Sequence, residues 1–278
     1  MAGVSFICAT CGTGYPPSEE PPPFCPICRE PRQYVPGSGQ AWTTMLNLSR
    51  QHMNGFRLVE DGLMGVVSHP KIGIGQRALI LRTPAGNILW DCITLLDEAT
   101  HDIIRSIGGL AAIAISHPHY YATMADWSRA FGDCPVFLHA DDKQWIMHPC
   151  PGVRLWSGET MEIAPGATLV RCGGHFAGGT VLHWAGGGGG RGALLAGDIV
   201  MVVPDRTHVS FMRSYPNLWP LSAPAVERIG AALEPFDFEV IYGPFFGRDV
   251  LEDGKEVVRR SVARYAAAVR GDGSAERG

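Results

Sequence analysis

The feature that most constrains this chain is a short apolar run, residues 109–115, that is followed by His117 and His119. An apolar run of this length, bounded by paired glycines and by Pro118, predicts a buried β-strand. In open α/β sheets, the side chains just beyond the ends of such strands usually carry the chemistry. Alternate residues of an extended segment point to the same side, so the two imidazoles should converge. The pair has two interpretations. It is either half of a transition-metal site, since imidazole is the commonest metal ligand, or two polar loop residues.

The composition is that of an ordinary globular protein. The chain has 278 residues, of which 46% are hydrophobic and 18% charged, enough for one large domain or a domain with an appendage. The net charge of -4 gives no electrostatic reason to expect nucleic-acid binding. We find no apolar run long enough to span a bilayer and no signal-peptide pattern. We therefore expect a cytoplasmic protein without nucleic-acid or membrane partners, whose eight cysteines stay reduced.

Four of these cysteines form two Cys-x-x-Cys pairs, Cys8/Cys11 and Cys25/Cys28, with thirteen residues between the pairs. Each pair can form a tight turn that points both sulfurs at one ion, and four thiolates complete a tetrahedral shell. The alternatives are two disulfides or a redox-active pair, but the Pro-rich surroundings do not form the sheet–helix junction that redox pairs occupy. The segment resembles zinc ribbons and rubredoxins. This resemblance implies a structural site for zinc, with iron left open.

The remaining patterns divide the chain into four parts. They are a zinc ribbon (1–36), a linker with a helix (37–55), a main domain (56–270) and a disordered tail (271–278). Residues 42–51 have helical spacing, with Thr43 or Thr44 as a possible cap. Within the main domain, strand patterns and helical patterns alternate in two successive halves. This order predicts an α/β (α+β) protein with two packed sheets and helices outside them.

Two further polar residues follow strand-like runs. His175 lies between glycines in the segment 173–179, and Asp198 ends the apolar run 194–197. The succession of His117-x-His119, Gly-Gly-His175 and Gly-Asp198 resembles the metallo-β-lactamase fold superfamily. The resemblance covers approximately residues 58–269 and implies a four-layer αββα sandwich with a metal site at one edge. It implies metal-assisted hydrolysis as the default chemistry, although the superfamily also contains iron-dependent oxidoreductases and non-catalytic members.

The departures from the family motif are informative. The family pattern is His-x-His-x-Asp-His, but Tyr121 and Ala122 occupy its last two places here. The segment 241–247, which matches the late histidine of the family, contains no histidine. All three terminal ligands of a second metal are therefore missing, while the first site is whole. We expect a single ion with the following ligands: His117, His119, His175 and Asp198.

The favoured function is a mononuclear metal-dependent hydrolase. If three histidines hold zinc, hydroxide on the ion could attack an ester, amide or thioester carbonyl of a small-molecule substrate. Asp198 is either a fourth ligand or the group that orients the water and accepts its proton. Tyr120 is a candidate to hydrogen-bond the substrate. The alternatives are an oxidoreductase with iron on the same ligands, or a binding protein that has lost catalysis. The ribbon offers a surface for a homodimer.

Overall fold

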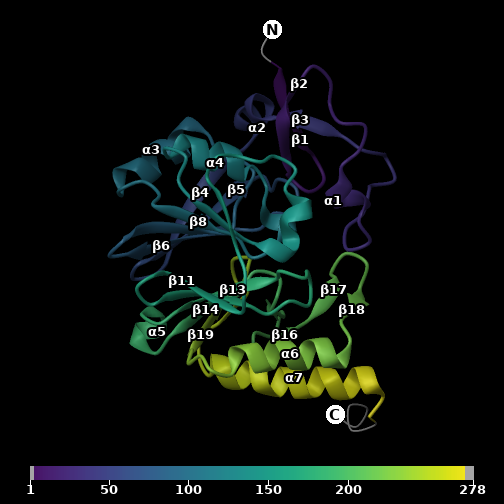
Figure 1. Ribbon diagram of the computed structural model, residues 1–278, viewed down its shortest axis with the longest axis vertical. Helices are drawn as coiled ribbons and strands as arrows, with labels where there is room; N and C mark the ends of the chain where they lie inside the picture. Colours follow the sequence, from purple (N-terminus) through teal and green to yellow (C-terminus); the bar gives the residue numbers. More distant parts are fainter. Residues whose placement is uncertain (1–2, 273–278) are drawn as a thin grey trace. The chain divides into compact units, whose positions relative to one another are not determined.

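The computed structural model describes residues 3–272, which form two compact units that meet in the sequence at Trp156 and Ser157 (Figure 1). The expected disordered tail, 271–278, lies almost entirely outside the described residues. No helix in the described part of the chain combines the length and apolar character needed to cross a bilayer.

The first unit opens with a small antiparallel sheet in the order β2-β1-β3. Its elements are β1 (Val4–Cys8), β2 (Gly14–Ser18) and β3 (Trp42–Thr44), with the one-turn helix α1 (Pro26–Arg29) beside them. Residues that the sequence assigned to the linker thus supply the third strand, because Cys8 pairs with Trp42 and Phe6 with Thr44. The helix α2 (Met45–Gln51) starts only after this strand. Its cap is Thr44, whose hydroxyl accepts a hydrogen bond from Asn47 N.

The large sheet of the first unit has seven strands in the order β10-β9-β8-β7-β6-β5-β4. Its strands are β4 (Met53–Glu60), β5 (Leu63–His69), β6 (Ala78–Thr83), β7 (Gly86–Trp90), β8 (Ala112–Ala114), β9 (Val136–His139) and β10 (Val153–Trp156). The strands β4 to β7 are antiparallel, whereas β7, β8, β9 and β10 run parallel. The parallel strands carry their carboxyl ends to one edge, so residues that follow β7 and β8 become neighbours.

The helices α3 and α4 lie together on one side of this sheet (Figure 1). The helices of the unit beyond α2 are α3 (Glu98–Ser106), α4 (Met124–Ala130) and the 3-10 turns η1 (Pro118–Tyr120) and η2 (Ala140–Trp145). Ile104 of α3 and Trp127 of α4 pack with strand residues such as Ile113 in one apolar core. Burial of these side chains is the main force that holds the helices on the sheet.

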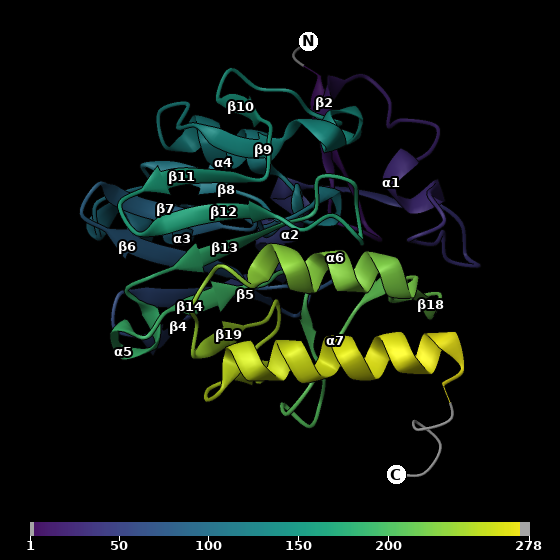
Figure 2. The same ribbon diagram turned by 60° about the horizontal axis from the view of Figure 1, so that its bottom comes forward.

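The second unit has its own mixed sheet, in the order β11-β12-β13-β14-β19-β20. Its strands are β11 (Thr160–Ala164), β12 (Ala167–Arg171), β13 (Thr180–Trp184), β14 (Ala193–Leu195), β19 (Val240–Tyr242) and β20 (Asp249–Val250). Its helices are α5 (Gly187–Gly190), α6 (Ala223–Leu233) and α7 (Gly254–Arg270). Figure 2 shows α6 and α7 lying side by side, and both pack into the apolar core of the sheet. Two short hairpins precede α6: β15 (Met201–Val202) with β16 (Val209–Ser210), and β17 (Met212–Ser214) with β18 (Trp219–Pro220). The expected α+β class, with mixed sheets and helices, is confirmed.

Candidate metal centres

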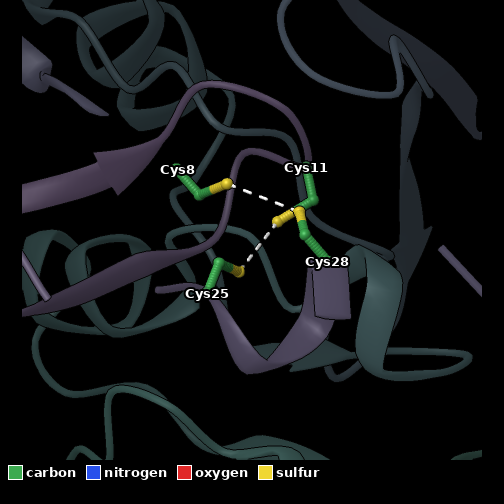
Figure 3. Close-up of side chains that lie close together, drawn as sticks. All are labelled: Cys8, Cys11, Cys25 and Cys28. Carbon is green, nitrogen blue, oxygen red and sulfur yellow. Dashed lines mark hydrogen bonds between the residues drawn. The ribbon is translucent and has the colours of Figure 1, made fainter. Parts of the chain in front are cut away.

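The four ribbon cysteines converge on one point (Figure 3). The Sγ atoms of Cys8 and Cys28 are 3.6 Å apart, as are those of Cys11 and Cys25. These distances exclude disulfides, whose sulfurs are bonded at about 2.05 Å. They match the separation of about 3.8 Å between thiolates that surround a tetrahedral zinc at about 2.3 Å. The β1–β2 turn supplies the first pair, and the start of α1 supplies the second.

Polar side chains around the sulfurs favour deprotonated cysteines. The phenol of Tyr15 donates a hydrogen bond to Cys25 Sγ at 3.1 Å, and the amide of Gln40 donates to Cys8 Sγ at 3.2 Å. Hydrogen bonds from the other three cysteines lower the pKa of Cys8, whereas hydrogen bonds with the other three raise the pKa of Cys11. The four sulfurs therefore compete for protons. All four sulfurs can be thiolates together only when a cation offsets their charge.

His117 is held by a chain of hydrogen bonds that starts at the neighbouring strand. Asp91 follows β7, and its Oδ1 accepts hydrogen bonds from the backbone N–H and the hydroxyl of Ser116, at 2.8 and 2.7 Å. The Ser116 oxygen lies 2.8 Å from Nδ1 of His117. Because the hydroxyl gives its only proton to the carboxylate, it accepts from Nδ1–H of the imidazole. This tautomer places the lone pair on Nε2, the nitrogen that can then coordinate a metal.

The turn η1 carries the rest of the motif. The His119 ring lies edge-on to that of His117, with 5.2 Å between their centroids. The ring of Tyr120 lies 4.4 Å from that of His117 and is fully buried in the apolar core of the sheet. Burial raises the pKa of Tyr121 well above its ordinary value, so this phenol stays neutral. Ala122 has a left-handed backbone, with φ of 43°.

In the second unit, His175 is oriented by a backbone carbonyl. Its Nδ1 lies 2.9 Å from the carbonyl oxygen of Met212 in β17, an atom that can only accept. The lone pair of this imidazole is therefore also on Nε2. Gly173 and Gly174 before it have φ of 67° and 79°, a conformation that favours glycine and turns the chain at the end of β12.

Asp198 follows β14 and is almost fully buried. The hydroxyl of Tyr215 donates to its backbone carbonyl oxygen at 3.0 Å, and the same ring lies 5.7 Å from that of His175. Burial, and then the nearby carboxyl of Asp198, raise the pKa of Tyr215 well above its ordinary value, so its hydroxyl remains a donor. Tyr215 thus connects the loops that carry both residues.

These side chains form two groups that could bind metal ions. One contains the four cysteines, and the other is the set expected from the sequence, namely His117, His119, His175 and Asp198. In each group every residue offers one ligand atom, and these atoms lie within 4.8 Å of one another. Both donor sets suit zinc, which takes sulfur, imidazole and carboxylate ligands, and the second set also suits iron.

The sequence reasoning missed the residues that orient the ligands. Asp91 ends an apolar strand next to the strand before His117, which was a usable signal. Ser116 could be found only because it directly precedes His117 in the chain. The Met212 carbonyl gives no signal at all, because every residue has one. Tyr215 was visible only as part of an aromatic segment.

Several other histidines and cysteines have structural roles. His139 caps η2, since its Nδ1 accepts a hydrogen bond from Asp141 N. Cys92, Cys134 and Cys172 are buried as free thiols. Burial raises the pKa of Cys134 to about 11 and that of Cys172 to about 12.

Comparisons with known proteins agree with the fold. No family model matches the chain. The Bacillus subtilis (strain 168) protein described as "Uncharacterized protein YmaE" is 44% identical over 266 residues, which are 95% of this chain and 96% of that protein. The crystal structure of VMB-1 at pH 5.5 has a TM-score of 0.58 at 14% identity, covering 78% of this chain and 98% of VMB-1. The DIM-1 metallo-β-lactamase has a TM-score of 0.58 at 12% identity, covering 77% of this chain and 97% of DIM-1. Identities this low show a shared fold and leave the substrate open.

Proposed function

Since the chain belongs to the family of YmaE and has the metallo-β-lactamase fold, we propose that it is a mononuclear metal-dependent hydrolase of a small-molecule substrate. The proposed ligands are His117, His119, His175 and Asp198. We further propose zinc at this site, structural zinc at the four cysteines and a cytoplasmic location, where reduced thiolates persist.

The observation that carries the proposal is the orientation of two imidazoles from separate segments. Nδ1 of His117 is hydrogen-bonded to Ser116, and Nδ1 of His175 to the Met212 carbonyl. Such partners fix the tautomer of a ligating histidine and raise its basicity, and they are a usual feature of metal sites. A purely structural pair of histidines would not need both rings held in the same tautomer.

The chemistry follows from a single ion. The three imidazoles and the Asp198 carboxylate would hold a divalent ion, which would supply Lewis-acid chemistry: a more acidic water and a polarised carbonyl group. The carboxylate of Asp198 is close enough to the imidazoles to share the ion or to accept a proton from the attacking water. Tyr120 remains a candidate for substrate contact, although its ring packs in the core beside His117. The matching positions for a second ion hold Tyr121 and Ala122, which cannot ligate in the family manner.

Metal analysis together with hydrolysis assays tests the proposal. We expect zinc at both groups in the purified chain, loss of one equivalent in a Cys25→Ser/Cys28→Ser variant, and loss of the other in a His117→Ala/His175→Ala variant. Hydrolysis of chromogenic esters, thioesters and anilides should disappear only with the second loss. A His52→Ala variant serves as the control, because it changes a half-buried histidine whose Nδ1 is hydrogen-bonded to the Pro70 carbonyl oxygen.

Two outcomes would redirect the assignment. Iron at the His/Asp group with consumption of oxygen would make the chain an oxidoreductase. A His/Asp group that stays metal-free at saturating zinc would make it a binding protein, with the ribbon as the candidate homodimer surface.

A further inference from the structure

The second unit contains an open cavity of about 710 Å³ that none of the proposed metal ligands occupies. It lies between the β17–β18 hairpin, the start of α6 and the end of α7. Its walls include apolar groups from Trp219, Leu221 and Ala225, and two guanidinium groups, those of Arg213 and Arg228, also line it. Among residues 3–272, no carboxylate lines it. The cavity is therefore both apolar and positively charged.

Two arginines of the cavity have no acidic partner in the part of the chain that the structure describes. Within residues 3–272, neither Arg213 nor Arg228 forms an ion pair, whereas Arg259 and Arg270 of α7 pair with Glu234 and Glu227. The guanidinium carbon of Arg213 lies 4.9 Å from the centre of the Trp219 ring, a contact that holds the cation in place. The Nε–H of Arg213 is buried and has no acceptor in the described part of the chain. A buried donor without a partner is costly, so an external acceptor is favoured here.

The start of α6 adds to the positive potential. Ser222 is its N-cap residue and lines the cavity, but its side chain makes no capping hydrogen bond. The first N–H groups of a helix and its dipole favour an anion at this end. A second cavity, of about 260 Å³ between α6 and α7, lacks this character because Glu234 lines it together with Arg259, its ion-pair partner.

Two backbone segments connect the cavity to His175. Gly174, which lines the cavity, directly precedes this histidine. Arg213 directly follows Met212, whose carbonyl oxygen is the hydrogen-bond partner of His175 Nδ1. A ligand anchored by Arg213 would therefore lie beside the loop that carries a proposed metal ligand.

We propose that this cavity binds the anionic group, a carboxylate or a phosphate, of a substrate whose remaining part is apolar. The identification of the bound molecule as substrate rests on the proposed hydrolase function. The arginines bind the anion as guanidinium groups do elsewhere, with charge-assisted hydrogen bonds, and Trp219 and Leu221 contact the apolar part.

Binding is tested on the full chain with octanoate and octyl phosphate, and with neutral octanamide as the control ligand, by isothermal titration. We expect the anions to bind more tightly than octanamide, with the better of the two identifying the anionic group. An Arg213→Gln/Arg228→Gln variant should lose affinity for the anions by about tenfold or more and leave octanamide unaffected. Arg264→Gln, which changes an exposed arginine of α7 away from the cavity, should have no effect. Equal binding of octanoate, octyl phosphate and octanamide, or unchanged anion affinity in the double variant, would refute the site.

Kinetics separates this inference from the hydrolase proposal. The substrates are two p-nitrophenyl esters, the anionic hemisuccinate and the neutral butyrate. If both are hydrolysed, the Arg213→Gln/Arg228→Gln variant should raise KM for the hemisuccinate only. If both esters are hydrolysed and the double variant does not raise KM for the anionic ester selectively, the cavity proposal is refuted and the hydrolase proposal is retained. Arginine-dependent anion binding, retained in His117→Ala, without hydrolysis of any ester supports the cavity and overturns the hydrolase.

Discussion

The backbone N–H of Gly14, in the cysteine ribbon, donates a 2.9 Å hydrogen bond to the carbonyl oxygen of Ala122, the residue that ends the histidine motif. A second contact lies beside it, where the hydroxyl of Thr94 donates to the carbonyl oxygen of Gly12 at 3.2 Å. A Cβ atom on Gly12 would lie only 2.1 Å from that hydroxyl, so the approach requires glycine. The ribbon is therefore docked on the turn that carries His117 and His119.

This docking predicts that loss of the ribbon metal loosens the histidine turn. In Cys25→Ser/Cys28→Ser, amide hydrogen exchange in a peptide spanning 115–124 should accelerate by about tenfold or more, because local opening no longer has to break the Gly14–Ala122 contact. Cys150→Ser, a half-buried thiol outside the ribbon, provides the control. Unchanged exchange in the double variant would show that the ribbon is independent of the turn.

Asp91→Asn should weaken metal binding without removing a ligand. The amide is a poorer acceptor for the two Ser116 hydrogen bonds and no longer fixes the tautomer of His117. Affinity for zinc or cobalt at the His/Asp group should fall about 10–100-fold, measured by competition with a chromogenic chelator. Asp102→Asn, at an exposed carboxylate, should leave the affinity unchanged. Full affinity in Asp91→Asn would mean that Ser116 orients His117 unaided.

Gly174→Ala should destabilise the fold and displace His175. The residue has φ of 79°, and a Cβ there would lie 2.8 Å from Ile229 Cδ1 and 3.0 Å from Leu221 Cδ1. Gly189→Ala is the matched control, because its φ is 67° but no atom lies within 4 Å of the added Cβ. The left-handed backbone should cost both variants about 1 kcal/mol. Urea unfolding should show a further loss of about 1–3 kcal/mol for Gly174→Ala alone, from overpacking. Equal stabilities would mean that Ile229 and Leu221 move aside at no cost.

The buried thiols should resist alkylation at pH 8. With burial raising the pKa of Cys172 from 9.0 to about 12, the thiolate fraction is only about one in ten thousand. The folded state keeps a proton that the unfolded chain releases above pH 9.0, so the free energy of unfolding should fall as pH rises from 9.0 toward 12. Peptide mass spectrometry after iodoacetamide should find Cys150 modified in the native chain, and Cys92, Cys134 and Cys172 modified only after denaturation. Rapid native labelling of Cys172 would contradict its burial.

Several features follow from the sequence alone because they depend on near neighbours. The spacing of Cys8, Cys11, Cys25 and Cys28 already limits which atoms can meet around one ion, since each pair is a single turn. The alternation of strand and helical patterns along residues 56–270 predicted the mixed α+β class. The motif at His117 and His119 identified the end of a buried strand by its abrupt change from apolar to polar residues.

What the sequence could not decide depends on partners far along the chain. Residues 42–44 have a helical pattern, but they form β3 because Phe6, Ile7 and Cys8 offer an unpaired strand edge. A hydrogen-bond donor or acceptor on the backbone is the same at every residue, so neither the Met212 carbonyl at His175 nor the Ala122 carbonyl at Gly14 leaves a mark in the sequence. Side-chain types therefore determined which residues can ligate. The tertiary structure decided how the imidazoles of His117 and His175 are oriented, and it left Arg213 without an ion-pair partner among residues 3–272.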